Sequence, residues 1–211
     1  MIKKLIFQYY NHQLKQIYSK NVEKHGCIPA AIFWNSKKSQ FNRFEILIKL
    51  VKKFQANYKI SIADVGCGYG SLLDFLIKNN YKDITYSGYD INPLLIKSCV
   101  KKYPNISFSI NNFPSVNCDL AIMSGTYNLC VGNSVSLWEE YIIYNLKKCF
   151  NFCKKGMIFN LQYSKSSYIK NFIYYTNVKN MEKTLNKHFN RVEIFYNSNT
   201  GNDVYFTISK N

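Results

Sequence analysis

The sequence has few arginines, few acidic residues and no long apolar run. Of its 211 residues, 28 are lysine or arginine and 12 are acidic, and only Arg43 and Arg191 are arginines. A formal net charge of +16 usually indicates a nucleic-acid partner. Arginine, however, is the side chain that most often reads base edges, and it is nearly absent here. The many Lys, Asn, Ile, Tyr and Phe residues are typical of AT-rich codons, so the charge does not require an anionic partner.

The chain also lacks the patterns that mark a disulfide framework, a zinc ribbon or a leader segment. Its seven cysteines are odd in number and include no C-x-x-C pair, so we expect free thiols and no metal site. The apolar run at the N-terminus stops at Gln8, too short for a signal core or a membrane span. We therefore expect a cytoplasmic protein without a membrane span.

A glycine-rich turn between a strand and a helix is the most informative stretch. Residues 60–65 form the short apolar run of a strand that is covered on both faces. Gly66, Gly68 and Gly70 follow within five residues, so the backbone can turn sharply and a ligand can approach closely. The next residues carry a helical apolar face, and the amides at that helix start are free to meet an acidic group.

The spacing of these glycines distinguishes two kinds of nucleotide ligand. A dinucleotide fingerprint is G-x-G-x-x-G, and Ser71 stands here in place of its third glycine. The run Asp64-x-Gly66-x-Gly68-x-Gly70 instead resembles the first motif of class I S-adenosylmethionine (SAM) dependent methyltransferases, of a small uncharacterised bacterial type. The resemblance implies that Asp64 orients the turn and the methionine part of SAM, and that Cys67 touches the cofactor.

A second acidic residue strengthens the resemblance. Residues 84–90 are expected to form a strand that ends at Asp90, about 20 residues after the turn, as one βαβ half-unit requires. A carboxylate placed there can accept hydrogen bonds from both ribose hydroxyls, which is the role that the family assigns to this position. Ile91 follows it at the cofactor, and Asn92-Pro93 begins the next helix.

The resemblance implies three further cofactor contacts. The corner after the third strand, at residues 106–110, carries Asn111 and Asn112, either of which could accept from the adenine amino group, with Asn112 favoured. The fourth strand, 119–123, leads into Ser124 at the reaction centre. A Ser-Gln-x-x-Arg-Phe segment places Arg43 where its guanidinium could hold the cofactor's carboxylate.

The methyl acceptor is less defined than the cofactor. Tyr127, Asn128 and Tyr163 are expected to line its site, since they follow the fourth and fifth strands. The Asn/Asp-Pro-Pro-Tyr/Phe motif of amide and adenine methylation is absent, as is a Pro-Cys dipeptide. None of the three histidines is predicted to be a base, so no catalytic residue is identified.

The resemblance extends from about residue 40 to residue 208 and implies the architecture. We expect a Rossmann-like three-layer α/β sandwich with a seven-stranded, mostly parallel sheet of order 3-2-1-4-5-7-6, a C-terminal antiparallel hairpin and extra N-terminal helices. Residues 1–50 would form those helices, packed on the domain or closing over the cofactor as a lid, and residues 51–211 would form the SAM-binding domain.

The sequence also predicts individual element boundaries. Ser39 is expected to cap a helix, Gly156 to end the helix at 138–153, and residues 157–161 to form the fifth strand. The segment 168–176 is expected to cover the substrate.

The predicted function is methyl transfer from SAM to an O or N acceptor of a small molecule or protein by in-line displacement. Two alternatives remain open. An RNA methyltransferase would gather lysines around the cofactor mouth. A non-catalytic SAM-binding partner protein would have that mouth plugged by the N-terminal helix.

Overall fold

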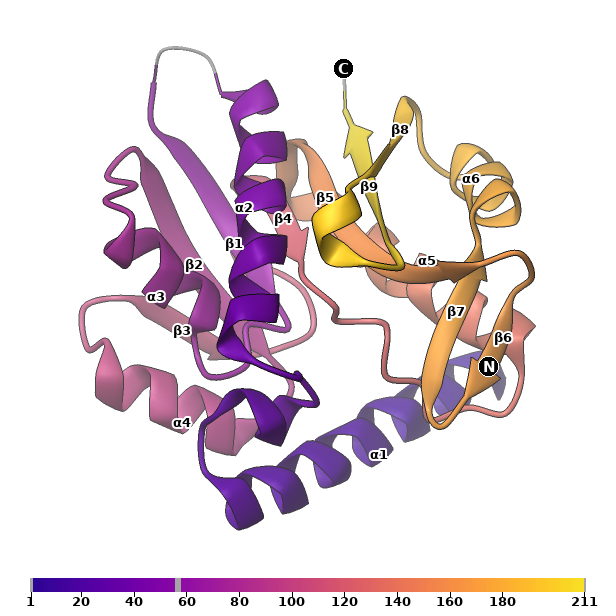
Figure 1. The fold of residues 1–211 in the computed structure, drawn as a ribbon, viewed down its shortest axis with the longest axis horizontal. Helices are drawn as coiled ribbons and strands as arrows, with labels where there is room; N and C mark the ends of the chain where they lie inside the picture. Colours follow the sequence, from indigo (N-terminus) through magenta and orange to yellow (C-terminus); the bar gives the residue numbers. More distant parts are fainter. Residues whose placement is uncertain (1, 56–57, 211) are drawn as a thin grey trace.

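The computed structural model describes residues 2–55 and 58–210, which form a central sheet with helices on both faces (Figure 1). The helices are α1 (Ile2–His25), η1 (Pro29–Ile32), α2 (Lys37–Phe54), α3 (Ser71–Lys78), α4 (Pro93–Lys102), α5 (Val135–Phe152), α6 (Val178–Asn186) and η2 (Ser198–Thr200). The strands are β1 (Ile60–Val65), β2 (Ile84–Asp90), β3 (Ser107–Ile110), β4 (Cys118–Met123), β5 (Cys153–Ser164), β6 (Tyr168–Lys170), β7 (Ile173–Asn177), β8 (Val192–Tyr196) and β9 (Asp203–Ser209).

The sheet confirms the predicted fold class. Strands β3, β2, β1, β4 and β5 lie side by side and parallel, β9 runs antiparallel along β5, and β8 pairs with β9 as a hairpin. The predicted strand count is wrong, because the described residues contain nine strands and not seven. The two extra strands are β6 and β7. Strand β5 extends past the end of β4, whose last pair is Met123 with Phe159, so its end, Gln162–Ser164, is free on that edge to pair with β7.

Side chains of the central strands point alternately to the two faces of the sheet, and helices cover both faces. In β1, Ile60 and Ile62 belong to the apolar cluster that α2 and α3 complete. Ala63 and Val65 belong to the other cluster, which α1, α5 and α6 complete. A parallel strand must bury both faces in this way, which is why the run from Ile60 to Val65 is apolar nearly throughout.

Two predicted boundaries are wrong. Helix α5 ends at Phe152, and Gly156 lies inside β5, where it pairs with Ser209. A Cβ on Gly156 would lie 2.1 Å from the carbonyl oxygen of Ile208, so the close approach of β9 requires glycine there. Helix α2 begins at Lys37, because the Oγ of Ser36 accepts from the amide of Ser39 and makes Ser36 the cap.

Helix α1 crosses one end of the sheet, between α4 and the β6–β7 hairpin (Figure 1). Its first half buries Phe7 and Tyr10 against the aromatic rings of Trp138 and Tyr141 on α5. This half is therefore part of the hydrophobic core. No helix in the described ranges is long and apolar enough to cross a membrane.

Candidate active site

The glycine turn after β1 is held against the end of β2. The amides of Gly66 and Cys67 both donate to the carbonyl of Tyr89, at 2.7 and 3.0 Å. Gly66 and Gly68 adopt positive φ angles of 80° and 57°, which side chains rarely tolerate. A Cβ on Gly66 would also lie 2.7 Å from the side chain of Thr126. The turn therefore leaves bare backbone beside the end of β4.

Asp90 connects this turn to the next loop. Its Oδ2 accepts from the amide of Gly68 at 2.9 Å, and its Oδ1 accepts from the amide of Asn92 at 2.8 Å. Burial raises the pKa of Asp90 to about 6, although these amide hydrogen bonds act in the opposite direction. A carboxylate has about four lone-pair positions, so the Asp90 carboxylate can still accept hydrogen bonds from a ligand.

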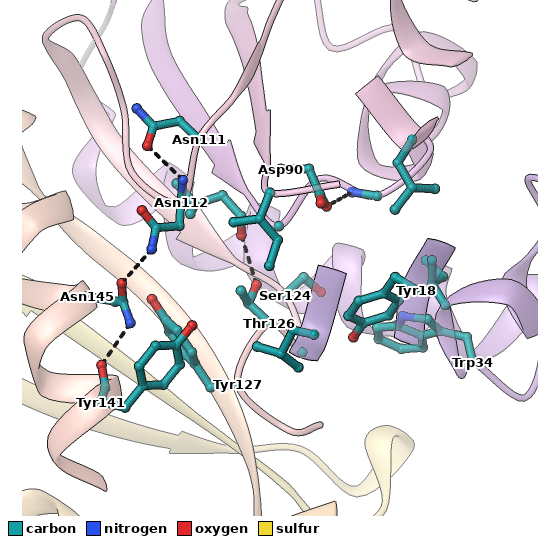
Figure 2. A pocket seen from close by; sticks show the side chains of 18 residues that line it. Tyr18, Trp34, Asp90, Asn111, Asn112, Ser124, Thr126, Tyr127, Tyr141 and Asn145 are labelled. Atoms are coloured by element: carbon teal, nitrogen blue, oxygen red, sulfur yellow. Dashed lines mark hydrogen bonds between the residues drawn. The ribbon is translucent and has the colours of Figure 1, made fainter. Parts of the chain in front are cut away.

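A chain of amides forms the adjoining wall (Figure 2). The amide nitrogen of Asn112 donates to Oδ1 of Asn111, and Nδ2 of Asn112 donates to Oδ1 of Asn145 at 2.9 Å. Asn145 in turn donates to the carbonyl of Tyr141 at 2.8 Å. This arrangement fixes the orientation of Asn112 and leaves its Oδ1 as the acceptor. Asn145 was not predicted, because a polar residue on an amphipathic helix is normally solvated.

The loop after β4 is hydrogen-bonded to the neighbouring strands β1 and β5. Thr126 donates its hydroxyl to the carbonyl of Val65 at 2.8 Å, and the amide of Gly125 donates to Oδ1 of Asn160 at 2.8 Å. The Oγ of Ser124 is buried and has no hydrogen-bond partner among the described residues. An unpaired buried hydroxyl is costly, so this atom marks where a ligand atom would be stabilised.

These elements enclose a first cavity of about 90 Å³ at the carboxyl edge of the sheet (Figure 2). Eight predicted site residues line it: Gly66, Gly68, Asp90, Ile91, Asn111, Asn112, Ser124 and Tyr127. Its roof consists of Leu14 and Tyr18 from α1 together with Ile32 and Trp34. Small-molecule sites are usually about 300–1,000 Å³, so this roof must withdraw before a nucleoside-sized ligand can enter.

The roof is attached to the loop that follows Asp90. The side-chain amide of Asn92, which is fully buried, donates to the carbonyl of Lys15 and to the hydroxyl of Ser19. The Oδ1 of Asn92 accepts from the first amides of α4. One side chain thus links α1, α4 and the end of β2.

Arg43 lines a second cavity, of about 330 Å³, and not the first. Tyr18, Ile32, Trp34 and Gly125 line both cavities, so the two share a wall. Asn128, another predicted site residue, also lies in the second cavity, where its Oδ1 accepts from the amide of Gln162.

The other predicted residues lie outside both cavities. Asp64 is buried and accepts from the hydroxyl of Tyr86 at 2.7 Å. Cys67 is buried, Gly70 caps α3 beside the ring of Tyr103, and Tyr163 packs edge-on against Tyr196. The described residues contain no group of three or more His, Cys, Asp or Glu side chains arranged to hold a metal ion.

The burial of Asp64 can be tested through the pH dependence of stability. Burial raises its pKa to about 7, the Tyr86 hydroxyl opposes the shift, and the charge of Asp90 adds to it. The folded carboxyl therefore binds its proton more tightly than in the unfolded chain, so the wild type should lose stability as pH rises from about 4 to 7. We expect Asp64→Asn to gain about 2 kcal/mol relative to wild type between pH 5 and pH 8, measured by urea unfolding. If the difference in unfolding free energy between Asp64→Asn and wild type were the same at pH 5 and pH 8, the raised pKa of Asp64 would be contradicted.

The sheet order and the polar loops at its carboxyl edge are those of the class I SAM-dependent methyltransferase fold, in agreement with the resemblance seen in the sequence. No model of a known protein family matches the chain. A protein of Mycobacterium tuberculosis named "Putative methyltransferase Rv1506c" is 28% identical over 120 residues, which cover 54% of this chain and 72% of that protein.

Solved structures agree on the fold. Magnesium protoporphyrin IX methyltransferase from Synechocystis, with bound S-adenosylhomocysteine (SAH), has a TM-score of 0.60 at 11% identity and covers 82% of this chain and 84% of its own. A SAM-dependent methyltransferase from Leishmania major has a TM-score of 0.63 at 10% identity over 92% of this chain and 82% of its own. One from Clostridium acetobutylicum has a TM-score of 0.56 at 12% identity over 94% and 98%.

Proposed function

We propose that this protein is a SAM-dependent methyltransferase that transfers the methyl group to an O or N acceptor of a small molecule or protein. The observation that carries the proposal is the set of unused acceptors around the first cavity. Asp90, Asn112 and Ser124 each offer an oxygen there, beside a glycine turn without side chains. Related folds that bind SAM or SAH support the same cofactor.

The described residues fit the parts of SAM. Asp90 would hold the ribose hydroxyls, and the Oδ1 of Asn112 would accept from the adenine amino group. The buried hydroxyl of Ser124 would meet the methionine end beside Gly66 and Gly68. Tyr127 would close the reaction side of the cavity.

When bound, SAM supplies a methyl group that its sulfonium already activates. The protein then mainly aligns the acceptor with that group and excludes water. The roof residues Tyr18 and Trp34 suit the second task, because they cover the cavity with aromatic surface. Asp90 and Asn112 contribute to the alignment by holding SAM, because hydrogen bonds to the glycine turn and to α5 fix their orientation.

Calorimetry with SAH tests the cofactor assignment. We expect the wild type to bind one SAH per chain, and Gly68→Val to bind at least about 100-fold more weakly. Gly68 has a positive φ, and a side chain there would push into Ile32, whose Cδ1 lies 3.2 Å from the added Cβ. Gly201→Val is the matched control, because Gly201 also has a positive φ but has no atom within 4 Å of an added Cβ. Equal SAH affinity in wild type and Gly68→Val would contradict the assignment.

One observation favours the alternative of a non-catalytic SAM-binding protein. The roof of α1 and Trp34 reduces the first cavity to about 90 Å³, which is the plugged mouth that this alternative predicts. Transfer of a labelled methyl group from SAM to a component of a cell extract distinguishes the two functions. The RNA alternative gains no support, because no lysine among the described residues lines either cavity.

A further inference from the structure

The second cavity adjoins the first, so a molecule bound in it would lie next to the proposed cofactor site. It shares a wall of Tyr18, Ile32, Trp34 and Gly125 with the first cavity, and Gly125 lies just after β4. Its volume of about 330 Å³ suits a small molecule and not a folded macromolecule. Its aromatic lining includes Tyr175, whose ring stacks on Tyr168 and therefore forms a fixed planar wall.

Arg43 gives this cavity a cation held in one orientation. Its Nε donates to the Asp203 carboxylate, and its Nη1 donates to the carbonyl and the hydroxyl of Ser39 at 3.0 and 2.6 Å. The guanidinium lies 4.7 Å from the Trp34 ring. Its Nη2 has no hydrogen-bond partner within residues 2–55 and 58–210, although the side chain is only 13% exposed. This amino group is the donor left for a ligand.

Asp203 pairs with Arg43 but does not line the second cavity. Its side chain is fully buried, and its other oxygen accepts from Nδ2 of Asn160 at 3.2 Å. Asn160 in turn accepts from the amide of Gly125, so the chain of hydrogen bonds reaches the loop shared by both cavities. The described lining of the second cavity therefore contains a cation and neutral amides, such as Asn128 and Gln162, but no carboxylate.

Among the described residues that line the two cavities, none is suited to remove a proton. The described lining residues include no histidine or lysine, and their only carboxylate is Asp90, whose oxygens accept from Gly68 and Asn92. Burial raises the pKa of both Tyr18 and Tyr127, so these hydroxyls keep their protons near neutral pH. An amine is protonated at that pH and would need a base before it could attack.

We propose that the second cavity binds the methyl acceptor, and that this acceptor is a small planar molecule with an ionised oxygen, a carboxylate or an acidic phenol. The proposal rests on the proposed function. The acceptor oxygen uses one lone pair to form the new C–O bond, and the S–CH₃ bond breaks with both electrons remaining on sulfur. The anionic charge of the acceptor and the positive charge of the sulfonium cancel, and no proton moves. Arg43 is then a positioning group for the acceptor, in place of its predicted role at the cofactor carboxylate.

Calorimetry with three probes of similar shape tests the charge preference: benzoate, benzamide and benzylamine, each added to the free and to the SAH-loaded protein. We expect benzoate to bind at least about tenfold more tightly than benzamide, and benzylamine to bind most weakly. A fourth probe, 4-nitrophenolate, distinguishes the two sources of the anion. A methyl ester or a methyl ether among the products of labelled SAM would identify which oxygen reacts.

Two variants test whether the preference for benzoate arises in the second cavity. The double variant Arg43→Gln/Asp203→Asn removes both charges without leaving either buried alone, and Gln162→Glu adds a carboxylate to the cavity wall. Each should reduce benzoate affinity about tenfold and leave SAH affinity within about twofold of wild type. Arg191→Gln is the control, because Arg191 is the other arginine of the chain, is exposed and lines neither cavity.

Three results would overturn the proposal: equal or tighter binding of benzylamine, an unchanged benzoate preference in both variants, or a tenfold loss of SAH affinity in the double variant. The last result would return Arg43 to the cofactor carboxylate. A wild-type protein that binds no SAH would overturn the proposed function instead, while the probe preference of the free protein would still decide the charge class of the cavity.

Discussion

Asp90→Ala should weaken SAH binding by at least about 100-fold, because two hydrogen bonds from ribose hydroxyls to a carboxylate are worth about 3–6 kcal/mol together. The same change removes the acceptor for the amides of Gly68 and Asn92, so the glycine turn should also loosen. Isothermal titration calorimetry measures the first effect, and urea unfolding measures the second.

Asp83→Asn is the matched control, because Asp83 lies at the opposite end of β2 and accepts from the side chain of Gln55. Its SAH affinity should equal that of wild type. An Asp90→Ala protein that unfolds like wild type and still binds SAH normally would show that the ribose lies elsewhere.

Gly156→Ala should be the most destabilising single change in the sheet. The added Cβ would lie 2.1 Å from the carbonyl oxygen of Ile208, and that atom belongs to the backbone of β9. Overpacking a core costs about 1–3 kcal/mol when side chains can shift, and a paired strand cannot shift without losing its ladder. We therefore expect a loss of more than about 3 kcal/mol in the free energy of unfolding, measured with urea.

Gly132→Ala provides the comparison for this prediction. A Cβ there would lie 2.6 Å from the hydroxyl oxygen of Tyr10, which is the far end of a side chain. The ring can tilt, so a loss of about 1 kcal/mol is expected. Similar losses in the two variants would mean that the contact between β5 and β9 is not as close as described.

The parts of the site that follow from local backbone chemistry could be predicted from the sequence. Three glycines in five residues allow a sharp turn with positive φ angles, and Asp90 ends the next strand, so their meeting follows from the parallel order of β1 and β2. The strand-end argument placed Ser124 at the same edge, whereas Asn112 was implied by the family resemblance, and both line the first cavity.

The parts that depend on distant contacts could not be predicted. The amphipathic pattern of α5 gave no reason to place Asn145 beside Asn112, because that contact joins residues 33 positions apart. The position of Arg43 depends on Asp203, which lies 160 residues later in the chain. Gly156 follows a helical pattern, where glycine commonly ends a helix, and only the partner strand β9 shows that it serves a close approach of two strands.

The strands β6 and β7 were missed for a related reason. Residues 168–177 contain short aromatic runs without a clear turn signal, and β7 pairs with β5 only because β5 extends past the end of β4. That overhang is set by the relative lengths of two strands, which local patterns do not encode.

The anchoring of α1 has a practical consequence for anyone preparing shorter versions of this protein. An expression clone that starts after His25 would uncover the rings of Trp138 and Tyr141 as well as the first cavity, because the same helix covers both. Such a truncated product would be expected to precipitate rather than to display an open, accessible site.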